Sequence, residues 1–261
     1  MAWSTGLAGL AVGLLIAVVT APVGVSGAVF LLPVQLSVLG VPSPAVTPTN
    51  LLFNVVAGPG ALLRYRREGL LNSPLARRLV AGTLPGVVIG AVVRVFAVPG
   101  ATVFRLLVAV LLMPLGLWLM TRTVRASRRR GPAADLSPRT ITGLALVVGI
   151  VGGIYGIGGG SILGPLLVGR GMPVSQVAPA ALASTFVTSL AGAAAFALLS
   201  LAGSGDIAPY WYLGLACGLG GLIGGYLGAH LQPRMPETVL RLLLGALAAA
   251  LGILYAVQAL R

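Results

Sequence analysis

The sequence predicts an all-α polytopic membrane protein built from two homologous repeats, and three observations support this fold class. The 261 residues are 57% hydrophobic and 8% charged, with a mean hydropathy of +1.04. Soluble domains carry about 25% charged residues, so lipid must be the solvent for most of this chain. Apolar segments long enough to cross a bilayer follow one another, and their motifs recur at a near-constant spacing.

Eight apolar segments are expected to form helices, because about 20 helical residues cross ~30 Å of hydrocarbon. They cover residues 6–39, 45–63, 79–97, 102–121, 141–170, 175–201, 210–229 and 238–258. The connections are short, and the longest polar stretch contains three consecutive arginines, at 128–130. We therefore expect one membrane repeat at residues 1–127, a basic cytoplasmic linker at 128–140 and a second membrane repeat at 141–261.

The two halves of the chain share their motifs in the same order. Residues 24–33 align with 156–165 without a gap, and Asn54 aligns with Thr185. Further matches pair Pro48 with Pro179, Gly86 with Gly221, Gly90 with Gly225 and Gly116 with Gly252. Internal repeats of this kind are typical of transporters, whose substrate site lies at the repeat interface near the membrane midplane.

Each half opens on a segment that is too long for one straight crossing. Residues 6–39 are interrupted at 22–27, and residues 141–170 are interrupted at 156–160. A helix of about 28 residues would be ~42 Å long. Each segment is therefore either a broken spanning helix or a hairpin of two half-helices that meet inside the membrane. Irregular backbone at that depth requires surrounding protein or a water-filled cavity.

The two alternatives predict different topologies. A broken spanning helix gives four crossings per half and parallel 4+4 repeats, whereas a re-entrant hairpin gives three crossings per half and inverted repeats. Arginine-rich loops stay in the cytoplasm. With hairpins, the arginines of stretches 64–78, 121–140, 170–173 and 230–241 are all cytoplasmic. We therefore favour inverted repeats and keep parallel repeats as the alternative.

The composition also excludes several classes of function. The formal net charge of +13 comes from arginines placed between apolar segments, which argues against nucleic-acid binding. The single cysteine, Cys217, allows neither an internal disulfide nor a multi-cysteine metal site. No Asp or Glu lies within a predicted span, which argues against a cation transporter and a proton relay. The N-terminus lacks a basic n-region, so no cleaved signal peptide is expected.

The glycine-rich stretch of the second half is the strongest candidate for chemistry. Gly156, Gly158, Gly159 and Gly160 carry no Cβ, so the chain can unwind there and turn backbone N–H groups toward a ligand. A half-helix that starts near Ser161 would direct the positive end of its dipole into this break. Unpaired N–H groups and that dipole together predict an anion site. Close helix packing alone is the alternative role for these glycines.

Polar side chains inside apolar segments are the second group of candidates. Asn50 and Asn54 lie four residues apart, on one helix face. Ser184 and Thr185 occupy the corresponding segment of the second half, and Gln35 is a further candidate. Together these side chains would line a neutral, donor-rich pocket. Hydrogen bonding between helices is their alternative role.

At these motifs the sequence resembles the sulfite exporter family, which is named for its taurine- and sulfoacetate-associated exporters. The family carries a glycine-rich run, an apolar stretch and a proline near the start of each half. Residues 156–165 match this pattern, whereas residues 24–33 have Ser26 and Ala28 where glycines are expected. The resemblance covers nearly the whole chain. It implies a multi-pass transporter of sulfite, sulfonates or similar small anions in a bacterial inner membrane.

We therefore expect a secondary carrier that moves sulfite or an organosulfonate by alternating access between the repeats. An anion channel or permease and a structural membrane subunit are the alternatives. An intramembrane enzyme would need a nucleophile and base, or a metal cluster, that the sequence lacks. We expect no cofactor and no metal. The expected partners are the anion, the lipid bilayer and, as one option, a second copy of the chain. The expected substrate-binding residues are Gly24, Ser26, Gly27, Asn50, Asn54, Gly156, Gly158, Gly159, Gly160, Ser161, Ser184 and Thr185.

Overall fold

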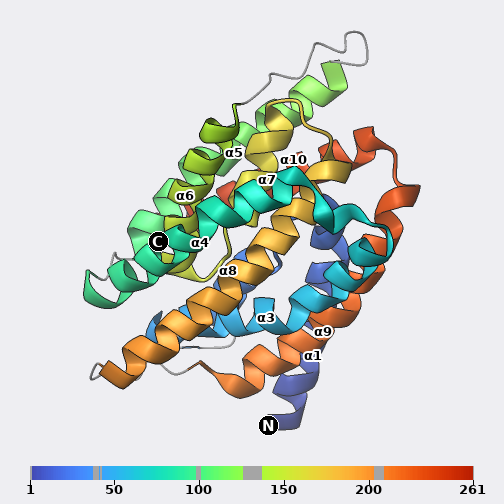
Figure 1. The fold of residues 1–261 in the computed structure, drawn as a ribbon. Helices are drawn as coiled ribbons and strands as arrows, with labels where there is room; N and C mark the ends of the chain where they lie inside the picture. The colour runs from blue at the N-terminus through green and yellow to red at the C-terminus, as the bar shows by residue number, and fades with distance from the viewer. Residues whose placement is uncertain are drawn as a thin grey trace.

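The chain folds into a bundle of helices (Figure 1). The computed structural model describes residues 2–37, 41, 43–97, 101–125, 137–202 and 209–260, and no β-strand occurs within them. The helices are α1 (Ala2–Thr20), α2 (Ala28–Ser37), α3 (Ser43–Arg67), α4 (Pro74–Phe96), α5 (Ala101–Arg125), α6 (Pro138–Tyr155), α7 (Gly160–Gly169), α8 (Val174–Ala202), α9 (Trp211–Leu231) and α10 (Glu237–Ala259). Short 3-10 turns lie at Ala21–Val23, Leu70–Asn72 and Gln232–Arg234.

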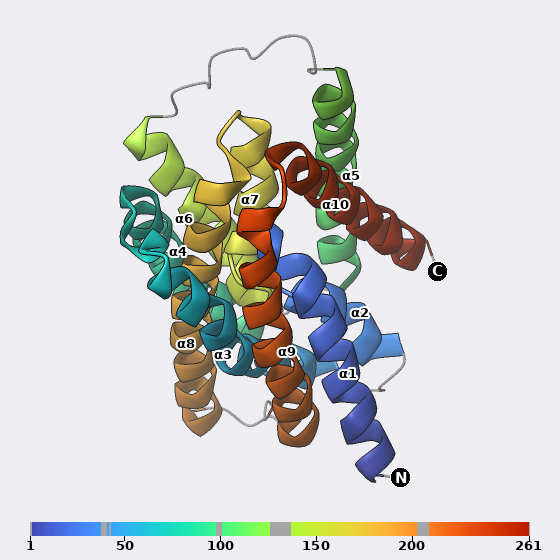
Figure 2. The same cartoon turned by 90° about the vertical axis from the view of Figure 1, so that its right-hand side faces the viewer.

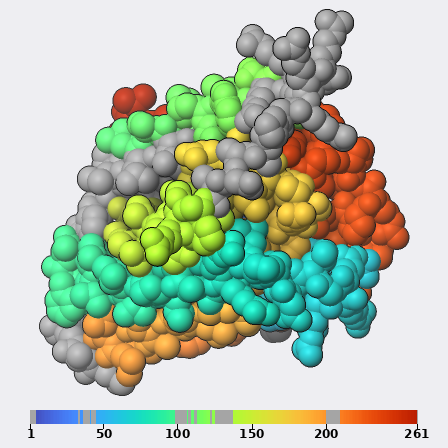
Figure 3. All heavy atoms as spheres, turned by 45° about the horizontal axis from the view of Figure 1, so that its top comes forward, coloured from blue at the N-terminus to red at the C-terminus, as the bar shows by residue number. Residues whose placement is uncertain are grey.

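The long helices have the length and apolar character of membrane spans. Seven candidate spans lie in the described part of the chain, on α1, α3, α4, α6, α8, α9 and α10. On one face of the molecule, α4 runs between α6 and α8 (Figure 3). Side chains of α4 that point away from the protein are apolar, as a lipid-facing surface requires: Leu84, Val88, Ile89 and Val92. The chain is therefore a multi-pass membrane protein.

Both long opening segments are broken at the positions that the sequence predicts. In the first half, α1 ends at Thr20 and α2 begins only at Ala28. In the second half, α6 ends at Tyr155 and α7 begins at Gly160. Gly24 and Gly156 have φ angles of 75° and 68°, in the left-handed region that glycine enters without steric cost. These two glycines are the reason why the helices stop there.

Two glycine ridges bring pairs of helices into backbone contact. One ridge, on α4, consists of Gly82, Gly86 and Gly90, and the other, on α9, consists of Gly220, Gly224 and Gly228. A Cβ atom at any of the six would overlap a carbonyl oxygen of the facing helix. The oxygens that face α4 belong to Thr142, Leu146 and Ile150 of α6, and those that face α9 belong to Leu10, Leu14 and Val18 of α1. The Gly-x-x-x-Gly spacing therefore serves close helix packing.

The helix ends gather at two opposite ends of the bundle. In Figure 2 the ends of α5, α7 and α9 lie at the top with the starts of α6, α8 and α10, while the start of α1, the end of α8 and the start of α9 lie at the bottom. Arg67, at the end of α3, donates a hydrogen bond to Tyr226 near the end of α9, so α3 also ends at the top. We call the top the arginine-rich end, because it holds Arg64, Arg66, Arg67, Arg77, Arg78, Arg139, Arg170, Arg234 and Arg241.

The predicted linker at residues 128–140 lies mostly outside the described residues. Its last three residues form the first turn of α6. The hydroxyl of Ser137 caps this turn by accepting a hydrogen bond from the backbone N–H of Thr140 at 3.1 Å. The second membrane segment therefore begins at Pro138, slightly earlier than the sequence predicts.

Candidate functional site

The two helix breaks meet in the interior of the bundle. The backbone N–H of Ser26, in the first break, donates a hydrogen bond to the hydroxyl of Ser161 at 3.1 Å. The side-chain amide of Asn54 donates to the carbonyl oxygen of Gly156, in the second break, at 3.4 Å. All four residues are buried. Each break is thus held in place by residues from the other half of the chain.

The packing of the two left-handed glycines is reciprocal. A Cβ atom on Gly24 would overlap the backbone of Ala178, in the first part of α8. A Cβ atom on Gly156 would overlap the carbonyl oxygen of Thr47, in the first part of α3. Each glycine is therefore required twice, once for its φ angle and once for the close approach of a helix from the other half.

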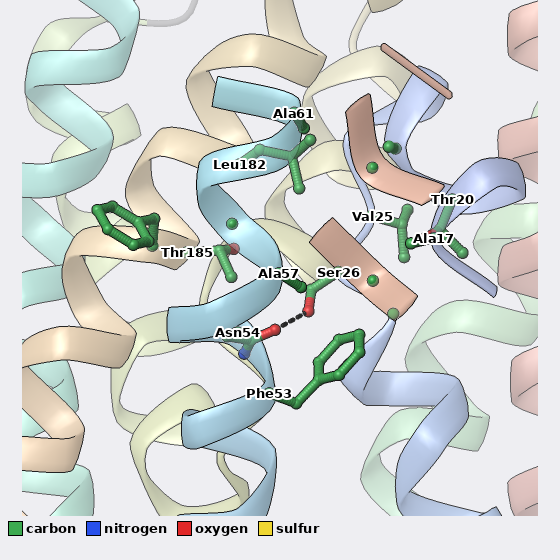
Figure 4. A pocket seen from close by; sticks show the side chains of 16 residues that line it. Ala17, Thr20, Val25, Ser26, Phe53, Asn54, Ala57, Ala61, Leu182 and Thr185 are labelled. Carbon is green, nitrogen blue, oxygen red and sulfur yellow. Dashed lines mark hydrogen bonds between the residues drawn. The ribbon is translucent and has the colours of Figure 1, made fainter. Parts of the chain in front are cut away.

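Ser26 organises the first break. Its hydroxyl donates to Oδ1 of Asn54 at 2.5 Å and accepts a hydrogen bond from the backbone N–H of Ala28 at 3.2 Å (Figure 4). It therefore caps α2 in the manner of an N-cap serine and also ties α2 to α3. The backbone N–H of Gly27 has no hydrogen-bond partner within the described residues. This break thus retains one buried backbone donor.

The second break is more closely packed, although the backbone N–H groups of Ile157, Gly158 and Gly159 also have no hydrogen-bond partner within the described residues. The backbone N–H of Gly160 donates to Oγ1 of Thr185 at 3.2 Å. The hydroxyl of Ser161 donates to the carbonyl oxygen of Ile157 at 3.2 Å, while it accepts the N–H of Ser26. A Cβ atom on Gly159 would lie 2.7 Å from the methyl carbon of Thr83, so no open space adjoins that glycine.

A cavity of about 40 Å³ adjoins the first break, between α1, α3, α8 and α9. A site needs roughly 10–15 Å³ to hold one water, so this cavity admits a few water-sized groups. Its wall is mostly apolar, with buried polar side chains at Thr20, Ser26, Asn54 and Thr185 (Figure 4). The remaining lining residues are Ala17, Ala21, Val25, Gly27, Phe53, Ala57, Gly58, Ala61, Leu182, Phe186, Gly221 and Gly225.

The electrostatics of this region come from helix ends rather than from charged side chains. None of the lining residues is charged. The N-termini of α2 and α7, each ten residues long, both lie at the meeting point of the breaks. A helix N-terminus carries a partial positive charge and unpaired N–H donors. The arrangement can therefore bind a small anion without a buried cation.

Four of the predicted site residues line the cavity, namely Ser26, Gly27, Asn54 and Thr185. The other eight are buried in or beside the two breaks but do not line it: Gly24, Asn50, Gly156, Gly158, Gly159, Gly160, Ser161 and Ser184. The second glycine run, the strongest candidate in the sequence, therefore has protein against it where the first run has a cavity. Side chains of Thr83 and Thr185 occupy that space.

Sequence reasoning did not select Thr20, Phe53 and Phe186, which also line the cavity. The sequence could have revealed Thr20 as a site residue, because a polar residue inside an apolar segment is a functional candidate. Its side chain is buried. The two phenylalanines carried no such signal, since aromatic residues are common on every face of apolar helices.

Comparison with known protein families decides the assignment. The family model for the sulfite exporter TauE/SafE matches residues 9–255. The chain belongs to the sulfite exporter TauE/SafE family. Searches of curated proteins and of solved structures find no match for this chain. TauE/SafE proteins are membrane transporters of sulfur anions, so this chain is a transporter and not an enzyme. Both breaks and the whole cavity lie within the TauE/SafE match.

Proposed function

We propose that this protein is a secondary carrier that binds sulfite or an organosulfonate, as a monoanion, where the two half-helices meet. The observation that carries the proposal is the convergence of two helix N-termini, joined by the Ser26–Ser161 hydrogen bond. Each N-terminus is equivalent to about +0.5 elementary charge, so the pair supplies about +1. One negative charge matches this value, whereas a doubly charged anion would remain partly uncompensated and costly to desolvate.

The donors around the cavity suit an oxyanion. The backbone N–H of Gly27 lacks a partner within the described residues, and Thr20 adds a hydroxyl side chain to the cavity lining. Asn54 has a second amide hydrogen beyond the one that it gives to Gly156, and the hydroxyl of Thr185 accepts from Gly160 but still has a hydrogen to donate. Several neutral donors can thus surround the oxygens of one small anion.

We further propose that the halves are inverted repeats. Equivalent contacts support this arrangement: Gly24 packs on α8 as Gly156 packs on α3, and the glycine ridge of α4 packs on α6 as that of α9 packs on α1. Asn54 and Thr185 also play matching parts, since each bonds the break of its own half. Inverted repeats of this kind allow one central site to face either side of the membrane in turn.

The position of the cavity indicates which side of the membrane the present conformation faces. It extends along α3 from Asn54 to Ala61, toward the arginine-rich end of the bundle. Positively charged loops face the cytoplasm. We therefore propose that this conformation faces the cytoplasm and that the opposite half of the pathway is closed.

Uptake of radiolabelled sulfite into liposomes that contain the purified protein tests the proposal. We expect saturable uptake that unlabelled sulfite and a simple sulfonate inhibit, whereas chloride inhibits it weakly. Asn54→Asp keeps the acceptor for Ser26 but replaces the donor with a group that repels anions. It should reduce uptake at least about tenfold, which corresponds to about 1.4 kcal/mol.

Thr123→Val is the matched control, because the hydroxyl of Thr123 bonds only the carbonyl of Leu119 in its own helix. It should leave uptake unchanged. Absence of uptake for any of these anions, or full uptake by Asn54→Asp, would contradict the proposal. Single-channel currents without saturation of the flux would show that the protein is a channel and not a carrier.

A further inference from the structure

A cluster of buried hydroxyl groups adjoins the second helix break. We call it the hydroxyl cluster and define it as Thr83 of α4 with Ser184, Thr188 and Ser189 of α8. All four side chains are at most 1% exposed. Four buried hydroxyls on two apolar membrane helices are costly to bury, so they are functional candidates.

The hydrogen bonds within the hydroxyl cluster leave one group unsatisfied. Thr83 donates to the carbonyl oxygen of Leu79 at 2.7 Å, so at the 2.8 Å contact with Ser184 it must be Ser184 that donates. Thr188 donates to the carbonyl oxygen of Ser184 at 2.7 Å. The hydroxyl of Ser189 is fully buried and has no hydrogen-bond partner among the residues that the structure describes. Unpaired buried hydroxyls are rare in native structures and require an explanation.

Under the proposed inverted symmetry, the hydroxyl cluster is the counterpart of the cavity wall. The alignment that pairs Asn54 with Thr185 also pairs Phe53, Ala57 and Gly58 with the three α8 residues of the cluster. The contacts agree, since Thr83 touches Ser184 on one side as Gly221 touches Phe53 on the other. The two regions differ in that one is an open space with an apolar wall, and the other is closed and polar.

We propose that the hydroxyl cluster is a second binding position for the same oxyanion, on the half of the pathway that is closed in this structure. This inference rests on the proposed function. In the opposite-facing conformation, Thr83 and Ser184 separate, and their hydroxyls together with that of Ser189 donate to the oxygens of the anion. The missing partner of Ser189 is then the anion itself or the water that accompanies it.

The packing shows what must move for this position to open. Gly149 and Gly153 of α6 lie against the backbone of α4 at Thr83 and Val87, and Gly159 faces the methyl group of Thr83. Separation of α4 from the second break would open space beside the hydroxyl cluster. On the other side, the present cavity lies between α9, which contributes Gly221 and Gly225, and the first break, which contributes Ser26 and Gly27.

Thiol labelling from each side of the membrane tests the location. In a Cys217→Ser background, Ala57→Cys places a thiol on the cavity wall, and Thr188→Cys places one at the matching position of the hydroxyl cluster. A membrane-impermeant thiosulfonate reagent should label Ala57→Cys from the face of the arginine-rich end and Thr188→Cys from the opposite face. Labelling of both from one face, or no labelling of Thr188→Cys in liposomes that transport sulfite, would overturn the inference.

Sulfite uptake by the double variant Ser184→Ala/Ser189→Ala tests the chemistry. We expect at least about a tenfold loss of uptake, with binding to the detergent-solubilised protein reduced less than threefold, because the cavity is intact. Thr123→Val again serves as control, because its hydroxyl bonds its own helix, at 2.7 Å, and lies outside the hydroxyl cluster.

These outcomes separate the two proposals. Wild-type protein without uptake contradicts the proposed function. Wild-type uptake that Asn54→Asp abolishes and Ser184→Ala/Ser189→Ala retains in full contradicts only the second binding position. If the double variant is not monodisperse in detergent, Ser189→Ala alone replaces it, because that hydroxyl makes no hydrogen bond whose loss would destabilise the fold.

Discussion

The backbone N–H of Ser26 donates a hydrogen bond to the hydroxyl of Ser161 at 3.1 Å, although the two residues are 135 positions apart in the chain. Ser26 precedes the first turn of α2, and Ser161 lies in the first turn of α7. Two positive helix ends in such proximity repel each other. A neutral hydroxyl bridges them in this structure, and an anion between them would turn the repulsion into attraction.

Ser161→Ala removes the acceptor from this contact. The buried N–H of Ser26 is then left unpaired, which costs about 1–3 kcal/mol. We expect a lower midpoint of thermal unfolding in detergent, whereas Thr123→Ala, which removes a hydroxyl bonded within its own helix, should change the midpoint little. An unchanged midpoint for Ser161→Ala would show that the contact between the breaks contributes no stability.

Gly24→Ala tests the close approach of α8 to the first break. Gly24 and Gly69 have nearly the same φ angle, at 75° and 73°. A Cβ atom on Gly24 would overlap Ala178, whereas one on Gly69 meets nothing within 4 Å. Gly69→Ala should therefore lower the stability by only about 1–2 kcal/mol, because it introduces backbone strain alone, whereas Gly24→Ala should fail to yield folded protein. Equal yields and equal thermal midpoints for the two variants would contradict the packing described above.

Gly58→Ala should change the selectivity of the cavity. Its Cβ atom would lie 2.6 Å from the ring of Phe186, which must then shift within the lining. We expect inhibition of sulfite uptake by bulky sulfonates to weaken about tenfold, while the smaller sulfite is affected less. Gly143→Ala is the control, because its Cβ meets nothing within 4 Å. Equal loss for all anions would mean that the cavity does not select by size.

Asn50→Leu tests the role of a buried side-chain amide that has no explanation in the fold. Asn50 is fully buried one turn before Asn54, and within the described part of the chain neither polar atom of its side-chain amide has a hydrogen-bond partner. Replacement by an apolar group of similar size removes this penalty, so we expect stabilisation by about 1–3 kcal/mol. Because the sequence predicts Asn50 as a substrate contact, Asn50→Leu should also reduce sulfite uptake. A lower thermal midpoint would mean that the amide is satisfied in the folded protein. If the variant is stabilised and keeps full sulfite uptake, Asn50 does not contact the substrate.

The sequence was sufficient to place the two helix breaks. Left-handed backbone is accessible mainly to glycine, so the runs around Gly24 and Gly156 marked the ends of α1 and α6. The Gly-x-x-x-Gly spacing on α4 and α9 allows close helix packing. The contacts make Gly82 the counterpart of Gly220, whereas sequence matching pairs Gly86 with Gly221.

The sequence was not sufficient to show which break adjoins a cavity. The richer glycine run appeared the better candidate, yet Thr83, which precedes it by more than seventy residues, fills the space beside Gly159. Whether a break is open or packed depends on side chains from distant helices, which no local pattern records. For the same reason Phe53 and Phe186 emerged as lining residues only from the structure.

Anomalous diffraction from crystals soaked in selenite, the selenium analogue of sulfite, would locate the bound anion. We expect one strong selenium peak within about 4 Å of the backbone nitrogen of Gly27 and the side-chain amide of Asn54, in the cavity beside the two helix N-termini. A peak only at surface arginines, or no ordered selenium at concentrations that inhibit sulfite uptake, would contradict this expectation.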